Sequence, residues 1–317
     1  MFLSECTAEM ISAAAQTLKN GALVAFPTET VYGLGADATN AKAVARIYQV
    51  KGRPADHPLI VHIASMQSIG QWAIDIPEYA IKLARDYWPG PMTLILKRSE
   101  LAQDFITGNQ DTVGLRVPAQ PIALALLKEF EKLGGKAIAA PSANRFGAVS
   151  PTTAAAVMDE LIPYLNIDID RILDGGPCLV GVESTIIDCT KPAPQILRLG
   201  AITKAMIEET TGLPVTSEDE PAIRVSGALD SHYSPKAEVV LNAIAESGEG
   251  FIALATIPTP TGAIRLASPN TVEQYARDIY AALRAGDARE LAKIVVILPE
   301  GEGLAEAIRD RITKAAF

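Results

Sequence analysis

Residues 40–63, NAKAVARIYQVKGRPADHPLIVHI, place a helix pattern directly before a strand pattern. Apolar residues recur every three or four positions after Asn40, which is a suitable N-cap, so the spacing predicts a helix over 40–51. The run 59–63 is apolar apart from His62 and predicts a buried strand. The segment between them carries one Gly and two Pro and predicts a turn. A helix that leads into a buried strand is typical of α/β proteins.

The same two patterns continue on both sides of this stretch, but they do not alternate strictly. We therefore predict a twisted, mixed β-sheet flanked by helices, not a regular doubly wound sheet. The predicted helices are 7–19, 77–87, 152–161 and 203–211, and the predicted strands are 21–26, 92–97, 113–117, 137–140, 172–173 and 184–188.

A change of composition divides the chain after residue 211. Residues 212–236 combine Gly, Pro, Ser and acidic residues without apolar periodicity, which is typical of a linker. We therefore expect a domain over 1–211 and a small α/β domain over 237–317. Its predicted strands are 238–241, 251–256 and 294–298, and its predicted helices are 272–285 and 303–315.

Composition excludes several classes of protein. The 317 residues are 49% hydrophobic and 21% charged, as in a soluble globular protein. The net charge of −9 offers no general positive field, so stable tRNA binding is not expected. No apolar run approaches the roughly 20 residues of a membrane span, and no signal peptide is visible, so the cytoplasm is the expected compartment. The three cysteines and three histidines lack ligand spacing, so no side-chain metal site is predicted.

Two short motifs could bind phosphate. GLGADA (33–38) resembles a dinucleotide-binding loop, but the preceding strand is expected to end by residue 27 and the next helix to begin near Asn40, so we do not predict a Rossmann site. Lys51 and Arg53 stand on a stiff turn, which suits phosphate oxygens. Cations at a helix C-terminus also complement the helix dipole, and both interpretations remain open. In either one, Lys51 is expected to be exposed.

Polar residues recur at the predicted strand ends. Arg116 lies on an apolar strand, where its burial would be costly unless it is paired or faces an anion. His62 also lies on an apolar strand, as a satisfied half-buried side chain or as a ligand contact. Small hydroxyl and amide groups at the ends of strands often line ligand sites in α/β proteins, although each of them singly is also a common turn residue. The residues of this kind are Thr28, Thr30, Thr93, Ser142, Asn144, Ser184 and Thr185.

Seven motifs together resemble the L-threonylcarbamoyladenylate synthase family, which has a YrdC-like domain. The resemblance covers about residues 8–211 and implies an open concave cleft on the sheet. HYSP (232–235), followed by a small α/β domain, is similar to the two-domain branch with a C-terminal accessory domain. The motifs are PTETVYGL (27–34), KGR (51–53), WPGPMT (88–93), GLRVP (114–118), PSAN (141–144), EST (183–185) and LRLG (197–200).

This resemblance implies a nucleotidyltransferase. Such enzymes join L-threonine, bicarbonate and ATP into threonylcarbamoyl-AMP and release pyrophosphate. This is the first step toward threonylcarbamoyladenosine, next to the anticodon of tRNA. It further implies Mg²⁺ carried by ATP, and a product passed to a tRNA threonylcarbamoyl transferase complex. No protein nucleophile is needed, because positioning and charge neutralisation suffice.

The resemblance also implies roles for individual residues. Lys51 and Arg53 would be catalytic and hold the phosphates, Arg116 would clamp the threonine carboxylate, Tyr32 would lie near the bicarbonate, and Tyr233 would fold back over the cleft. SGAL (226–229) departs from the Pro-Gly-Met common in the family linker. The remaining implied ATP contacts are His57, Thr112, Ser142, Asn144, Ser150 and Arg198, and the remaining threonine or bicarbonate contacts are Thr30, His62, Ala140 and Ser184.

Two other functions compete with this one. A carbamoyl transferase related to hydrogenase maturation handles a carbamoyl-adenylate in a similar fold, but it should carry an acylphosphatase-like segment and zinc-finger pairs. An RNA-binding module would use a cationic concave face, against which the net charge argues.

Overall fold

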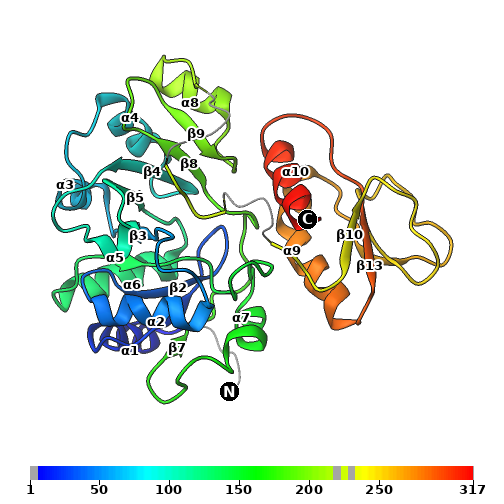
Figure 1. Ribbon diagram of the computed structural model, residues 1–317, viewed down its shortest axis with the longest axis horizontal. Helices are drawn as coiled ribbons and strands as arrows, with labels where there is room; N and C mark the ends of the chain where they lie inside the picture. The colour runs from blue at the N-terminus through cyan, green and yellow to red at the C-terminus, as the bar shows by residue number, and fades with distance from the viewer. Residues whose placement is uncertain (1–5, 217–222, 228–232, 317) are drawn as a thin grey trace.

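The computed structural model describes residues 6–216, 223–227 and 233–316. Figure 1 shows two units, a larger one around a nine-stranded sheet and a smaller one around a four-stranded sheet. The helices α9 (Val272–Ala288) and α10 (Leu304–Ala315) lie on the side of the smaller unit that faces the larger one. None of the described helices is both long and apolar enough to cross a membrane.

The large sheet is mixed, which confirms the prediction. Parallel pairs (β1 with β7, β3 with β5, β4 with β8) alternate irregularly with antiparallel ones. In order across the sheet, its strands are β7 (Arg171–Ile172), β1 (Val24–Phe26), β2 (Gly33–Asp37), β6 (Ile138–Ala139), β3 (Ile60–His62), β5 (Thr112–Arg116), β4 (Met92–Lys97), β8 (Thr185–Asp188) and β9 (Gln195–Arg198).

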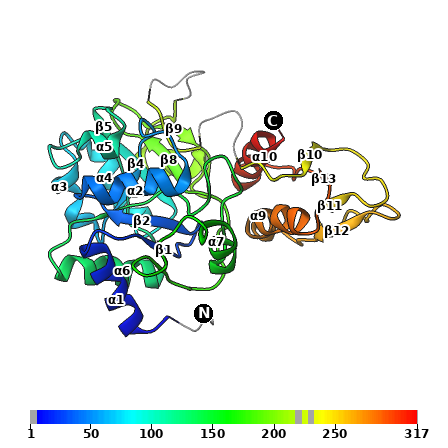
Figure 2. The same ribbon diagram turned by 60° about the horizontal axis from the view of Figure 1, so that its bottom comes forward.

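Helices cover the two faces of this sheet unequally. One face packs on the largest apolar core, which α2 (Ala41–Lys51), α4 (Glu78–Tyr87) and α7 (Ala154–Leu161) share. On the other face, α1 (Ala8–Lys19) and α6 (Pro121–Lys132) pack side by side over the β1 and β6 region (Figure 2). The rest of that face, from β3 to β8, carries Ile60, Ile95 and Ile186 and is partly covered by residues 223–227. This thinly covered area is where a ligand can approach the sheet.

Three shorter helices complete the first unit. They are α3 (Ile69–Trp72), α5 (Asp104–Thr107) and α8 (Lys204–Thr211), and a 3₁₀ turn, Met66–Ser68, precedes α3.

The smaller sheet is parallel throughout its described pairs, in the order β10-β13-β11-β12. Its strands are β10 (Glu238–Leu241), β11 (Gly250–Ile252), β12 (Ile264–Ala267) and β13 (Lys293–Val296). A small α/β unit was predicted here. The predicted linker over 212–236 falls partly outside the described residues, because 217–222 and 228–232 are not described.

The sequence interpretation missed the short helices α3 and α5 with the 3₁₀ turn, and four larger or more central elements, β2, α6, β9 and β12. The segment expected to be a loop before Asn40 is strand β2, which pairs with β1 and β6. Gly35 is required there, because a Cβ would lie 2.7 Å from Ile138 Cγ2 and 2.8 Å from Phe26 Cε1. Helix α6 begins with an uninterrupted apolar run over 121–127, in which no helical period stands out, and its N-cap is a glutamine, Gln120. Strands β9 and β12 are short, lie at sheet edges and contain arginine.

Candidate active site

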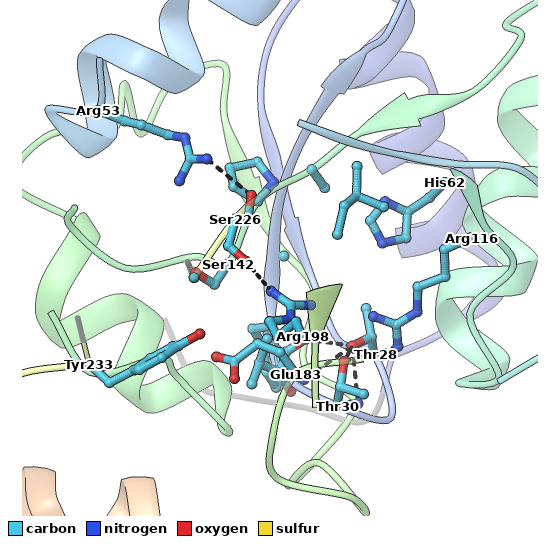
Figure 3. Close-up of a pocket in the computed structure, with 17 residues that line it drawn as sticks. Thr28, Thr30, Arg53, His62, Arg116, Ser142, Glu183, Arg198, Ser226 and Tyr233 are labelled. Atoms are coloured by element: carbon cyan, nitrogen blue, oxygen red, sulfur yellow. Dashed lines mark hydrogen bonds between the residues drawn. The ribbon is translucent and has the colours of Figure 1, made fainter. Parts of the chain in front are cut away.

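A pocket opens on the thinly covered face of the large sheet. Three guanidinium groups, those of Arg53, Arg116 and Arg198, line it together with one carboxylate, Glu183. Figure 3 shows His62 and Arg116 on one side of the pocket and Tyr233 on the opposite side. Such a lining suits a ligand with several negative charges.

Arg53 reaches the pocket because α2 ends sharply. Gly52, with φ of +62°, forms its left-handed C-cap, a conformation that favours glycine. The Arg53 guanidinium donates to the Pro58 carbonyl at 3.1 Å and to the Ser226 hydroxyl at 3.0 Å. Burial lowers the pKa of Arg53 to about 10, so the group remains a cation at neutral pH.

Arg198, at the end of β9, reaches the same residue from the other side. Its Nη1 donates to the Ser226 carbonyl at 2.9 Å, and its Nε and Nη2 donate to the carbonyl and hydroxyl of Ser184. The Ser184 hydroxyl also bonds Thr93 Oγ1 at 2.8 Å. Arg53 and Arg198 therefore converge on one linker residue.

Arg116 at the end of β5 forms the other end of the pocket. Its Nη2 donates to Glu29 Oε1 at 2.6 Å and to Thr30 Oγ1 at 2.9 Å, and both Arg116 and Glu29 are buried. Its Nε makes no hydrogen bond within the described residues. A buried guanidinium with an unused donor favours a further acceptor from a ligand.

His62 is buried, not half-buried as one interpretation had it, and its strand partner in register is Arg116. Burial, together with the charge of Arg116, lowers the pKa of His62 to about 3. The imidazole is therefore neutral in the physiological range. Its Nδ1 makes no hydrogen bond within the part of the chain that the structure describes.

Lys51 corrects the expectation of an exposed turn residue. It is 2% exposed, and its Nζ donates to the backbone carbonyls of Ser142 and Asn144. Burial and then the charge of Arg53 lower the pKa of Lys51. The side chain thus holds the PSAN loop against α2, and it does not line the pocket.

Among the described residues that line the pocket, Glu183 is the one carboxylate. Its Oε1 accepts from Ser150 Oγ at 2.6 Å, and its Oε2 accepts from Tyr280 Oη and from Arg311 Nε, each at 2.9 Å. Burial alone would raise the pKa of Glu183, but Arg311, Arg198 and these hydrogen bonds outweigh it and lower the pKa to about 2. Glu183 is therefore ionised at neutral pH, and its carboxylate accepts hydrogen bonds from residues of both units.

The remaining predicted contacts fall into two groups. Some line the pocket directly, namely Thr30, Tyr32, Ala140, Ser142 and Tyr233. The others lie behind the pocket or beside it. Ser150 and Ser184 are covered by their hydrogen-bond partners, and the Asn144 amide bonds the Arg145 and Ala148 carbonyls. His57 packs edge-on against Phe146, and Thr112 lines an adjacent apolar hollow with Ile95, Ile186 and Val225.

Tyr32 has its hydroxyl bonded to the Gly176 carbonyl at 2.8 Å and to Asp174 at 3.2 Å. Burial raises its pKa, so the phenol stays protonated. His232, the neighbour of Tyr233 in the HYSP motif, lies outside the described residues.

Several residues of the site were not predicted. Glu29 lies in the motif PTETVYGL and Glu183 in the motif EST. The need of a strand-borne arginine for a buried carboxylate partner is the signal that could have identified them. Ser226 also stood in a quoted stretch, SGAL. Nothing local in the sequence points to Tyr280 and Arg311, which come from the second unit.

The donor set of the pocket does not suit a resident metal ion. Its charged groups are mostly guanidiniums, and both oxygens of Glu183 already accept hydrogen bonds. Among the described residues, no group of three or more His, Cys, Asp or Glu side chains gathers in a way that could hold a metal ion.

The fold and the pocket define a class, a two-domain α/β protein with an arginine-lined pocket on the larger sheet. A family profile described as Telomere recombination matches residues 16–200, and one described as Threonylcarbamoyl-AMP synthase, C-terminal domain, matches residues 202–317. The chain belongs to the threonylcarbamoyl-AMP synthase family. This confirms the resemblance carried by the seven motifs.

Individual members of this family align with nearly the whole chain. The threonylcarbamoyl-AMP synthase of Pyrococcus abyssi is 40% identical, with 96% of this chain and 94% of that protein aligned. The one from Bacillus subtilis is 37% identical, with 96% and 92% aligned. The crystal structure of P. abyssi Sua5 complexed with L-threonine superposes with a TM-score of 0.87 at 38% identity, over 99% of this chain and 96% of that one.

Proposed function

We propose that this protein is a threonylcarbamoyl-AMP synthase that acts on L-threonine, bicarbonate and MgATP. The threonine nitrogen attacks the bicarbonate carbon and water is lost, which gives a carbamate. A carbamate oxygen then attacks the α-phosphorus of ATP, the bond from that phosphorus to the bridging oxygen breaks, and pyrophosphate leaves. The reaction is thus a nucleotidyl transfer.

One observation carries the proposal: the pocket brings together a pair of guanidiniums that share Ser226 and a third guanidinium apart from them, beside Thr30 and His62. Arg53 and Arg198 suit phosphate oxygens, whereas Arg116, with its unused Nε, suits the threonine carboxylate. The structure of the P. abyssi relative with L-threonine supports threonine as the ligand of this fold.

Catalysis here depends on placement and charge. The carbamate and the α-phosphate must meet in line, and the two ends of the pocket hold their parent molecules in one enclosed space. Arg53 and Arg198 would stabilise the negative charge that grows on the leaving pyrophosphate. The magnesium ion would arrive bound to the phosphates and share that task. Neutral His62 can donate or accept a hydrogen bond to threonine without competing for the charge of Arg116.

The product is a mixed anhydride that water destroys, so we propose direct delivery to a tRNA threonylcarbamoyl transferase complex. Since the final acceptor is tRNA, the cytoplasm is the compartment that we propose. With its net charge of −9, the chain itself is not expected to hold tRNA stably.

The test is pyrophosphate release with each small substrate omitted in turn. We expect release only when ATP, Mg²⁺, L-threonine and bicarbonate are all present, and threonylcarbamoyl-AMP detected by mass spectrometry. Equal release without threonine would contradict the proposal. Turnover with carbamoyl phosphate in place of threonine and bicarbonate would favour the carbamoyl transferase, and tRNA binding that weakens steeply with salt would favour the RNA-binding module.

A further inference from the structure

One side chain of the second unit, Arg311 on α10, contacts three separate segments of the pocket wall. Its Nε donates to Glu183 at 2.9 Å, and its Nη2 donates to the Leu199 carbonyl, next to Arg198, at 2.7 Å. Its guanidinium carbon lies 5.4 Å from the centre of the Tyr233 ring. Arg311 is fully buried, so these contacts exclude water.

Tyr280 on α9 supports the same wall. Its hydroxyl donates to Glu183 Oε2 at 2.9 Å, and its ring stacks on Tyr233 with 5.7 Å between centroids and 22° between planes. The Tyr233 ring therefore contacts Tyr280 and Arg311, both from the second unit. Lys314, one turn after Arg311, adds a hydrogen bond to the Gly227 carbonyl of the linker at 3.1 Å.

The threonine end of the pocket is built differently. Arg116 is held by Glu29 and Thr30, and Thr28 bonds both Thr30 and the Val31 carbonyl. All of these residues belong to the first unit, and within the described part of the chain none of their hydrogen bonds involves the second unit. The two ends of the pocket thus differ in their hydrogen bonds: Glu183 at the nucleotide end is bonded from the second unit, whereas Arg116 is bonded from the first unit alone. Val31, beside Thr30, reaches the second unit only through apolar packing.

We infer that Arg311 and Tyr280 are positioning residues, through which the second unit sets the placement of Glu183, Arg198 and Tyr233 at the nucleotide end of the pocket. They act through these three residues and do not line the pocket themselves. The inference rests on the proposed function for the nature of the ligand. It assigns the accessory unit a share in nucleotide binding, separate from threonine binding.

The test compares conservative variants with matched controls on the same helices. Arg311→Lys keeps the charge that Glu183 needs for folding but cannot make the three contacts at once. Tyr280→Phe removes one hydrogen bond and keeps the ring stack. The controls are Arg309→Lys and Tyr275→Phe. The Arg309 side chain bonds the Pro299 and Gly301 carbonyls, and the Tyr275 hydroxyl bonds the Ile297 carbonyl, so neither contacts the pocket wall.

We expect Arg311→Lys to raise the KM for ATP by about tenfold, the effect of losing one charged hydrogen bond, and Tyr280→Phe to raise it by about threefold. The KM for threonine should stay within about twofold of the unmodified protein. The controls should leave both constants unchanged. In a Glu183→Ala background, Tyr280→Phe should have almost no further effect, because the acceptor of the Tyr280 hydroxyl is already missing.

Equal changes in the two KM values, or equal effects of Arg309→Lys and Arg311→Lys, would overturn the inference and leave a merely structural role. Calorimetric titration with MgATP gives a readout that does not require turnover. If the unmodified protein binds MgATP but forms no threonylcarbamoyl-AMP, the proposed function fails, and the ATP affinities of the same variants still decide the inference. Melting temperatures of every variant separate weakened folding from displaced side chains.

Discussion

Arg53 donates to the side chain of Ser226, and this hydrogen bond of 3.0 Å ties the turn after α2 to a residue more than half the chain away. Arg198 donates to the carbonyl of the same residue. The linker therefore occupies two of the cations that we assign to the phosphates of ATP. Binding of the nucleotide must exchange these contacts for phosphate oxygens.

A Ser226→Ala variant should bind MgATP about two- to fivefold more tightly, because Arg53 loses one competing acceptor worth a fraction of a kcal/mol to about 1 kcal/mol. Calorimetric titration measures the change, and Ser99→Ala serves as the control, because Ser99 does not line the pocket and bonds Gln71 and Leu101. Weaker binding by Ser226→Ala would show instead that the hydroxyl contacts the nucleotide.

Lys51→Ala should lower both activity and stability. The sequence predicts a loss of at least about two orders of magnitude in rate from missing charge neutralisation. Because Lys51 does not line the pocket, we now expect the rate to fall through displacement of the PSAN loop, which Lys51 holds. The structure adds that two buried carbonyls lose their donor, which should cost about 2 kcal/mol or more of unfolding free energy. Pyrophosphate release and thermal unfolding measure the two effects. Lys42→Ala, on the exposed side of the same helix, should change neither, and an unchanged melting temperature for Lys51→Ala would contradict the buried placement.

Arg116→Lys should weaken threonine more than ATP. Lysine keeps the positive charge but cannot bond Glu29 and Thr30 while offering a second donor to a carboxylate. We expect the threonine affinity to fall by about tenfold or more, as for the loss of a charged hydrogen bond. Titrating each ligand separately decides the matter. If ATP binding weakened and threonine binding did not, Arg116 would belong to the nucleotide end.

Glu183 should make stability depend on pH in acid. Its pKa is lowered to about 2 in the folded chain from an ordinary value of 4.5, so its contribution is complete above pH 4.5 and is lost as the pH falls toward 2. Urea unfolding at pH 6 and pH 3 should show a smaller difference for Glu183→Gln than for the unmodified protein. Glu78→Gln, at an exposed position, is the control, and equal pH dependence in all three proteins would refute the assignment.

The sequence predicted the features that depend on neighbouring residues in the chain. Arg116 was found because an arginine on an apolar strand needs a partner, and the mixed sheet followed from the irregular order of helix and strand patterns. Strand β2 was missed because its glycines indicate a loop, whereas the packing of Phe26 and Ile138 over Gly35 makes it a strand. Lys51 was expected to be exposed because its position at a helix end does not reveal that the PSAN loop covers it.

Contacts between distant segments could not be predicted in this way. Glu183 stands in a recognised motif, yet its partners Tyr280 and Arg311 follow 97 and 128 residues later. Neither position carries a periodic or compositional signal, because any buried helix face can contain a tyrosine or an arginine. Tyr280 and Arg311 reach Glu183 only because α9 and α10 dock on the first unit.

The distance along the chain between Glu183 and Arg311 also bears on how the protein is made. A ribosome releases the first unit long before it has synthesised α10, so the large sheet can form while Glu183 has Ser150 as its only partner among the three hydrogen-bonding side chains described. During that interval the carboxylate keeps its hydration. By our proposal the nucleotide end of the pocket is complete only when α10 docks, so we expect a newly made chain to gain its full affinity for ATP only after α10 has been synthesised.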